Sequence, residues 1–196
     1  NILKNFLTVT LTTFVFSSVL WMLWAYIFIN GSSENKWLGS MFYFPHAARV
    51  LCVVYFGYKS IPGLFLAEIF GPTAIYSEVY QYQVFLPSLI SVLSVPAAIS
   101  TLHIAGFSLG SSQKSPLNKR NYKHIALITI ISALYNSIFA NFSLSLLDPA
   151  FQTRNTDIEQ VIRFALGDVV GTACVFIMLA IMLKPILASN TKKPRN

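Results

Sequence analysis

Six apolar segments, separated by short polar stretches, limit what this chain of 196 residues can fold into more than any other feature. They cover residues 5–29, 41–57, 61–76, 84–107, 124–147 and 159–184. A helix needs about 20 apolar residues to cross the hydrocarbon layer of a bilayer, and it pairs all of its own backbone groups there. The pattern predicts an all-α, polytopic transmembrane helix bundle of about six helices, two of them short.

The composition indicates a single membrane domain. Hydrophobic residues make up 55% of the chain and charged residues only 11%, which leaves too little polar surface to enclose a soluble core. The first segment is longer than the apolar part of a secretory signal and lacks a small-residue cleavage site, so we expect a permanent span. We expect a transmembrane helical domain over residues 1–186 and a basic cytoplasmic tail over 187–196.

The net charge of +7 gives the orientation. With six crossings, one side of the membrane receives Lys4, Lys59, Lys114, Lys119, Arg120, Lys123, Lys184, Lys192, Lys193 and Arg195. Cytoplasmic loops of membrane proteins are enriched in Lys and Arg, so both termini are predicted to be cytoplasmic. The excess charge then reflects topology and attraction to the lipid bilayer, and no nucleic acid is expected as a partner.

Ionisable residues inside the apolar segments are the candidate site, because a charge at the centre of a bilayer costs at least about 2.5–3.5 kcal/mol. Arg49 and Glu68 lie nine or ten residues on either side of the connection 58–60, so an antiparallel helix pair places them at one depth. Asp168 enters from the other side to a similar depth, and His46 lies one turn from Arg49. We predict a ligand-binding polar cluster of these four residues, with a buried ion cluster that only fixes helix register as the alternative.

Several neighbouring residues could support such a cluster. His103, Asn136 and Asn141 could add hydrogen-bond donors, although membrane residues of these types more often join helices than bind ligands. Gly167-x-x-x-Gly171 predicts the close approach of another helix to the Asp168 segment. Cys52 and Cys174 lie in apolar runs and are expected to be packing residues. We find no nucleotide, metalloprotease or hydrolase motif, and expect no metal, cofactor or catalytic residue.

Three motifs resemble a known family. They are FPHAA at 44–48, IPGLFLAEIFG at 61–71 and LGDVVG at 166–171. Their order and spacing are similar to those of the bacterial membrane-associated sensor domains of the first MASE class, over about two thirds of the chain. Members of that family usually have about eight helices followed by a histidine kinase, a diguanylate cyclase or a related output domain. The resemblance implies a sensory role in the bacterial plasma (inner) membrane.

Four functions are compatible with these features. The first is an integral membrane sensory or ligand-binding domain, in which Arg49 and His46 face a small polar or anionic ligand and Glu68 and Asp168 are their partners. The second is the substrate-binding component of a small-molecule transporter, which would open the same centre to both sides in turn. The third is an accessory subunit packed against a partner membrane protein. An intramembrane enzyme is the fourth, although no nucleophile or metal motif supports it.

Overall fold

A computed structural model describes residues 2–29, 41–75, 85–107, 122–147 and 158–190 of the chain. These residues form α1 (Ile2–Trp24), a π-helical turn η1 (Ala25–Ile29), α2 (Pro45–Phe56), a 3-10 turn η2 (Gly57–Ser60), α3 (Ile61–Ile75), α4 (Phe85–Ile104), α5 (Tyr122–Leu147) and α7 (Ile158–Asn190). The described part of the chain is almost entirely helical and contains no strand, which confirms the predicted all-α class. Each helix falls within a few residues of a predicted apolar segment.

Five stretches of the described chain are long and apolar enough to cross a membrane. Four of them are helices α1 (continued through η1), α4, α5 and α7, and the fifth is Pro45–Ala74, which contains α2, η2 and most of α3. The apolar character of these helices suggests a multi-pass membrane protein. α7 continues as a helix to Asn190, four residues beyond the predicted end of the transmembrane domain.

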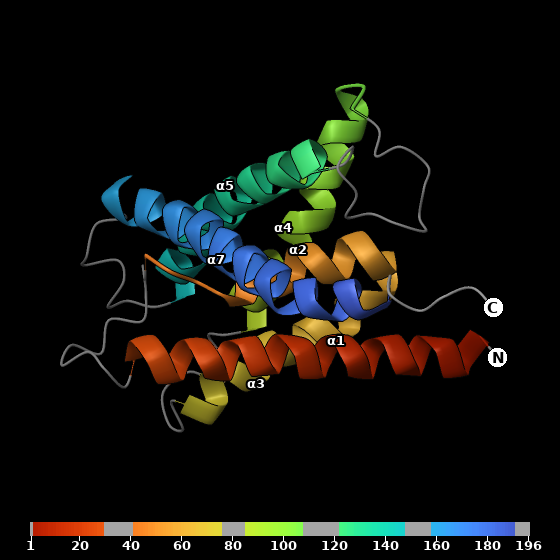
Figure 1. Cartoon of the computed structure of the whole chain (residues 1–196). Helices are drawn as coiled ribbons and strands as arrows, with labels where there is room; N and C mark the ends of the chain where they lie inside the picture. The colour runs from red at the N-terminus through yellow and green to blue at the C-terminus, as the bar shows by residue number, and fades with distance from the viewer. Residues whose placement is uncertain (1, 30–40, 76–84, 108–121, 148–157, 191–196) are drawn as a thin grey trace, which may run out of the picture.

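α2 and α3 form a hairpin that returns the chain to the level at which it entered (Figure 1). Gly57 ends α2 with a φ of 63°, a conformation that favours glycine over residues with a Cβ. The carbonyl of Ser60 in the turn accepts a hydrogen bond from Thr13 of α1. Tyr43 before α2 and Gly71 near the end of α3 both contact Trp21, two turns further along α1. The two helices are therefore antiparallel.

The hairpin helices are shorter than the long helices around them. α2 has 12 residues and α3 has 15, which at 1.5 Å per residue give about 18 Å and about 22 Å. The hydrocarbon layer is about 30 Å thick. The main packing partner of α1 is α3. α4 packs on α5, and α7 packs against both α2 and α5.

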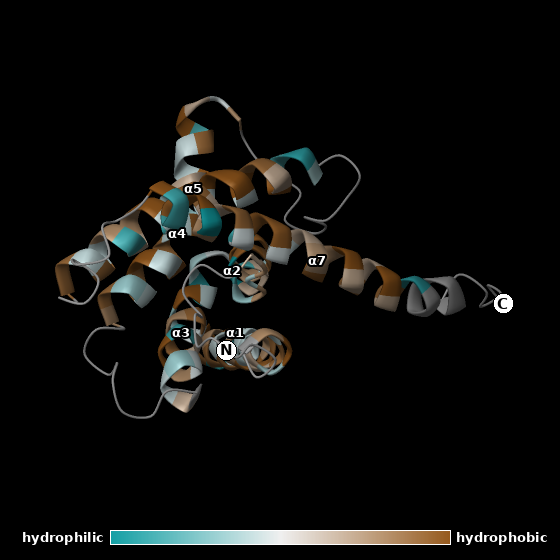
Figure 2. Ribbon diagram, turned by 90° about the vertical axis from the view of Figure 1, so that its left-hand side faces the viewer, coloured by the Kyte–Doolittle hydropathy of each residue, from teal (hydrophilic) through white to brown (hydrophobic). Residues whose placement is uncertain are grey.

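The interior of the described chain is more polar than a soluble core. Large apolar side chains such as Leu11, Phe142 and Ile177 are exposed, whereas His46 and Arg49 are buried. This inverted distribution fits a protein whose surroundings are lipid, because lipid tails accept apolar side chains and polar groups then pair inside. Figure 2 shows the hydrophobic colouring continuing along α7, where this helix projects away from the others.

Several predicted features fall on residues that the structure does not describe. These are the loops at 30–40, 76–84, 108–121 and 148–157, which include the basic cluster at 114–120, and residues 191–196 of the predicted tail.

Candidate functional site

The first ion pair of the site joins the two arms of the hairpin. Arg49 Nε lies 3.2 Å from Glu68 Oε1, and both side chains are buried. Arg49 Nη1 also donates to the carbonyl of Ser91 on α4 at 3.2 Å. The pairing of Arg49 and Glu68 that their symmetric spacing predicted is confirmed.

The second pair of the site joins α2 to α7. His46 Nδ1 lies 3.4 Å from Asp168 Oδ2, and the exposed fractions of the two side chains are 0% and 1%. The same Asp168 oxygen accepts a hydrogen bond from Asn136 Nδ2 of α5 at 2.6 Å. The sequence predicted that Asp168 lies at a depth similar to that of Arg49 and Glu68. Its side-chain contacts in the structure are with His46 of α2 and Asn136 of α5.

Hydroxyl groups connect the two pairs into one buried arrangement. Ser91 donates to Asn136 Oδ1 at 2.7 Å, so α4 links the Arg49 end to the Asp168 end. Ser132 of α5 lies 3.0 Å from His46 Nε2. Tyr43 donates to Glu68 Oε2 at 3.4 Å. We name these residues the polar network: Tyr43, His46, Arg49, Glu68, Ser91, Ser132, Asn136 and Asp168.

Tyr43 is held in place by its backbone and by aromatic rings. Its N–H donates to the carbonyl of Gly167 at 2.9 Å, and a Cβ at Gly171 would collide with the Tyr43 backbone. The predicted close approach at Gly171 therefore exists, but its partner is the short segment before α2 and not a helix, so that detail of the prediction is wrong.

The Tyr43 ring lies between α1 and the ionic residues of the network. It makes edge-to-face contacts with Trp21 and Trp24 of α1, at centroid distances of 5.6 Å and 5.2 Å. The Arg49 guanidinium lies 5.4 Å from the centre of the same ring. A cation beside a ring face is stabilised by the ring quadrupole, more so where water is excluded. Tyr43 therefore joins α1 to the ionic centre by aromatic contacts.

The ionisable groups of the network already have partners inside the protein. The predicted anion-facing groups, Arg49 and His46, each face a carboxylate of the chain itself. An anionic ligand would have to displace Glu68 or Asp168, each of which would then lose its partner. Within the network, neither Arg49 nor His46 is left without a carboxylate partner.

The order Ser132, His46, Asp168 follows that of a hydrolytic Ser-His-Asp triad. Ser132 is buried in the middle of α5, with an exposed fraction of 0%, and its hydroxyl donates to the carbonyl of Thr129 at 3.1 Å. A hydroxyl held in this way is not presented to a substrate. These three side chains instead bind α2, α5 and α7 to one another.

Other candidate residues lie away from the network. His103 is exposed in the last turn of α4, and Asn141 accepts a hydrogen bond from Gln160 at 3.1 Å, joining α5 to α7. Arg163 pairs with Glu159 at 2.7 Å on the surface of α7. Cys52 is buried and Cys174 is half-buried, and both are free. Within the described ranges, no group of three or more His, Cys, Asp or Glu side chains is arranged to hold a metal ion.

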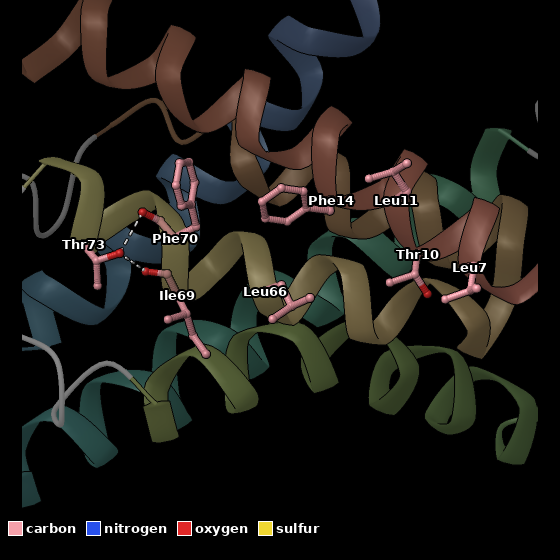
Figure 3. Close-up of a pocket in the computed structure, with 8 residues that line it drawn as sticks. All are labelled: Leu7, Thr10, Leu11, Phe14, Leu66, Ile69, Phe70 and Thr73. Atoms are coloured by element: carbon pink, nitrogen blue, oxygen red, sulfur yellow. Dashed lines mark hydrogen bonds between the residues drawn. The ribbon is translucent and has the colours of Figure 1, made fainter.

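Two surface grooves lie apart from the network. One, of about 670 Å³, runs between α1 and α3 and is lined by apolar side chains such as Leu11, Phe14 and Leu66 (Figure 3). Its Thr73 hydroxyl is turned to the carbonyls of Ile69 and Phe70. The other, of about 450 Å³, lies between α4 and α5. Both grooves are almost wholly apolar, which suits hydrocarbon chains and not a polar solute.

Comparison with known proteins finds no matching family, no matching curated sequence and no matching solved structure.

Sequence reasoning did not identify Tyr43, Ser91 and Ser132 as members of the network. Tyr43 precedes a helix, where no periodicity shows which way a side chain points. Ser91 and Ser132 look like the small residues that pack membrane helices. The available signal was that Ser132 and Asn136 lie four residues apart, and therefore on one face of a helix, as do Ser88, Ser91 and Ser94 at intervals of three.

Proposed function

We propose that the chain is a sensory domain of a multi-pass protein of the bacterial plasma membrane, and that the polar network is its response centre. The observation that carries this proposal is that Arg49, His46, Glu68, Asn136 and Asp168 connect α2, α3, α5 and α7 through direct side-chain contacts. A change in the charge or partners of any one of them must alter contacts between helices. The resemblance of the three motifs to the first MASE class supports the same reading.

The proposed topology has both termini in the cytoplasm. α1, α4, α5 and α7 each cross once, and the α2–α3 hairpin returns the chain to the side it left. The number of crossings is therefore even, whether or not the tip of the hairpin reaches the far surface. If it does, the count is the predicted six. In Figure 1 the N-terminal end of α1, the α2–α3 turn, the start of α5 and the C-terminal end of α7 all lie toward the right-hand side. Lys4, Lys59, Lys123 and Lys184 belong to these four places.

In this proposal α7 carries the response. It supplies Asp168 to the network in its first half, and its second half projects sideways from the bundle, across the direction of α1, which is seen end-on in Figure 2. Ile177, Ile181 and Met182 on that half are exposed. A small tilt of α7 about Asp168 therefore moves the distal end of the helix further than it moves Asp168, and fewer contacts restrain that end.

The test compares two substitutions on α5. Asn136→Ala removes the donor to Asp168 and the acceptor for Ser91, whereas Asn141→Ala removes a buried asparagine of the same helix that lies outside the network. Spin labels at Tyr58→Cys and Leu183→Cys, with Cys52 and Cys174 replaced by Ala, report the distance between the hairpin turn and distal α7. We expect Asn136→Ala to shift that distance by about 1–2 Å or more, and Asn141→Ala to leave it unchanged.

Unchanged distances in both variants would contradict a sensory role and leave a static ion cluster in an accessory subunit. Native mass spectrometry of the detergent-solubilised protein separates the remaining alternatives. A stably bound partner chain supports the accessory-subunit function, and a bound polar solute that also accumulates in proteoliposomes supports transport.

A further inference from the structure

We propose that one exchangeable proton is bound between His46 Nδ1 and Asp168 Oδ2, so that the ligand of the polar network is a proton. This inference deepens the proposed sensory function and rests on it for its biological meaning. The site consists of two side chains from different helices, 3.4 Å apart and almost completely buried. Its assignment follows from where the other hydrogens of the network must lie.

Ser132 fixes the first of these hydrogens. A serine hydroxyl has one hydrogen, and Ser132 donates it to the carbonyl of Thr129 at 3.1 Å. With that hydrogen on the carbonyl, the contact of 3.0 Å between Ser132 Oγ and His46 Nε2 is an N–H donated by the histidine. In this arrangement His46 carries a hydrogen on Nε2. A neutral imidazole of this tautomer has only a lone pair on Nδ1.

That lone pair faces Asp168. His46 Nδ1 has no other hydrogen-bond partner, and the Asp168 oxygen opposite it already accepts from Asn136. Asn136 is oriented by Ser91, which donates to its Oδ1, so the amide nitrogen is the atom turned to Asp168. An ionised Asp168 and a neutral His46 would place two acceptors against each other in a site that excludes water. One proton between them turns this repulsion into a hydrogen bond.

The charge balance leads to the same conclusion. Arg49 and Glu68 cancel. Asp168 and His46 add one negative charge without the shared proton and none with it, whichever of the two holds it. Burial disfavours an uncompensated charge, so the neutral, protonated form is the one that fits the interior.

The surroundings of the pair contain few other titratable groups. Among the described residues near the pair, α2 and the segment before α2 contribute Arg49 and Tyr43, and α3 contributes Glu68. α4 and α5 contribute the neutral groups of Ser91, Asn136 and Ser132. α1 contributes Trp21 and Trp24, which do not titrate. Loss of the proton would therefore act mainly on the contact between α2 and α7.

Stability against pH tests the proposal. Above about pH 7 the unfolded chain holds no such proton, because free Asp and His side chains release theirs at about pH 3.9 and 6.5. The folded protein holds one, so its unfolding equilibrium constant should rise tenfold per pH unit as the pH increases, until the folded form also releases the proton. Asp168→Asn has an amide that donates to Nδ1 without a proton to lose. Its unfolding constant should lack this tenfold term.

The ratio of wild-type to Asp168→Asn unfolding constants is measured in detergent from pH 7 to 9, and parallel profiles would overturn the proposal. A second measurement does not depend on the variant folding. Nitrogen NMR of the wild-type protein with ¹⁵N-labelled histidine should show His46 Nε2 protonated throughout this range. A neutral His46 with its only hydrogen on Nδ1 would also overturn the proposal, because Asp168 would then be ionised without it.

These results separate the two proposals. A tenfold pH term together with unchanged spin-label distances in Asn136→Ala supports the proton site and contradicts the sensory role. Shifted distances with parallel pH profiles support the sensory role and contradict the proton site.

Discussion

Removing Arg49 tests whether the network is held by its ion pair. Arg49→Ala deletes the contact of 3.2 Å with Glu68, the hydrogen bond to Ser91 and the contact with the Tyr43 ring. Glu68 is then left buried without its cation. Breaking a buried pair from one side destabilises proteins by about 3–5 kcal/mol, and we expect a loss of free energy of unfolding in that range.

The distance between Arg49 and Glu68 gives an upper bound on their electrostatic attraction. Two unit charges 3.2 Å apart interact by about 5 kcal/mol at an effective dielectric constant of 20. Part of this is offset by the cost of removing both groups from water, so the net coupling is smaller. Glu68→Gln in the Arg49→Ala background removes the orphaned charge. The double variant should therefore recover at least about 1 kcal/mol relative to the sum of the single losses.

The assay is reversible unfolding in detergent, with all four members of the cycle measured under one condition. Arg163 and Glu159 provide a matched control, because they form an arginine–glutamate pair on the exposed surface of α7. Their cycle should give a coupling of no more than about 0.5 kcal/mol, as exposed pairs one turn apart do. Strict additivity of Arg49→Ala and Glu68→Gln would refute the reasoning, since residues in contact cannot be energetically independent in this way.

Three further predictions follow from the packing and the proposed topology. Gly171→Leu should lower the free energy of unfolding by about 1–3 kcal/mol through collision with the Tyr43 backbone, while Ala173→Leu, exposed on the same helix, should melt like the parent. Gly71→Ala should also lower the free energy of unfolding, although alanine favours a helix more than glycine does, because the added methyl group meets the Trp21 ring. Trp21→Leu in the same chain should restore part of the loss. No restoration would mean that α1 and α3 do not touch there. In a background with Cys52 and Cys174 replaced by Ala, an impermeant thiol reagent should modify Tyr58→Cys only from the cytoplasmic side and Glu159→Cys only from outside, and the reverse pattern would overturn the orientation.

The helices could be predicted from sequence because apolar runs and their interruptions determine where membrane helices begin and end. The pairing of Arg49 with Glu68 could also be predicted, since both are counted from one turn and helix rise is constant. The partner of Asp168 could not. It depends on how α7 lies against α2, where Gly171 meets the Tyr43 backbone. No pattern within α7 reveals that a segment outside any helix will occupy the space beside a glycine.

The order of the helices along the chain has a consequence for biogenesis. In the proposed topology, α2 and α3 are each short and each carry an ionisable side chain, so the hairpin should insert more easily as a unit with Arg49 paired to Glu68 than either helix does alone. α1, synthesised before them, already offers the surface against which they pack. Asp168 reaches the membrane only with α7, the last of the described helices to be made. Until then His46 and Asn136 lack the carboxylate that both of them contact in the folded chain, so the polar network is completed only when the last described helix is in place.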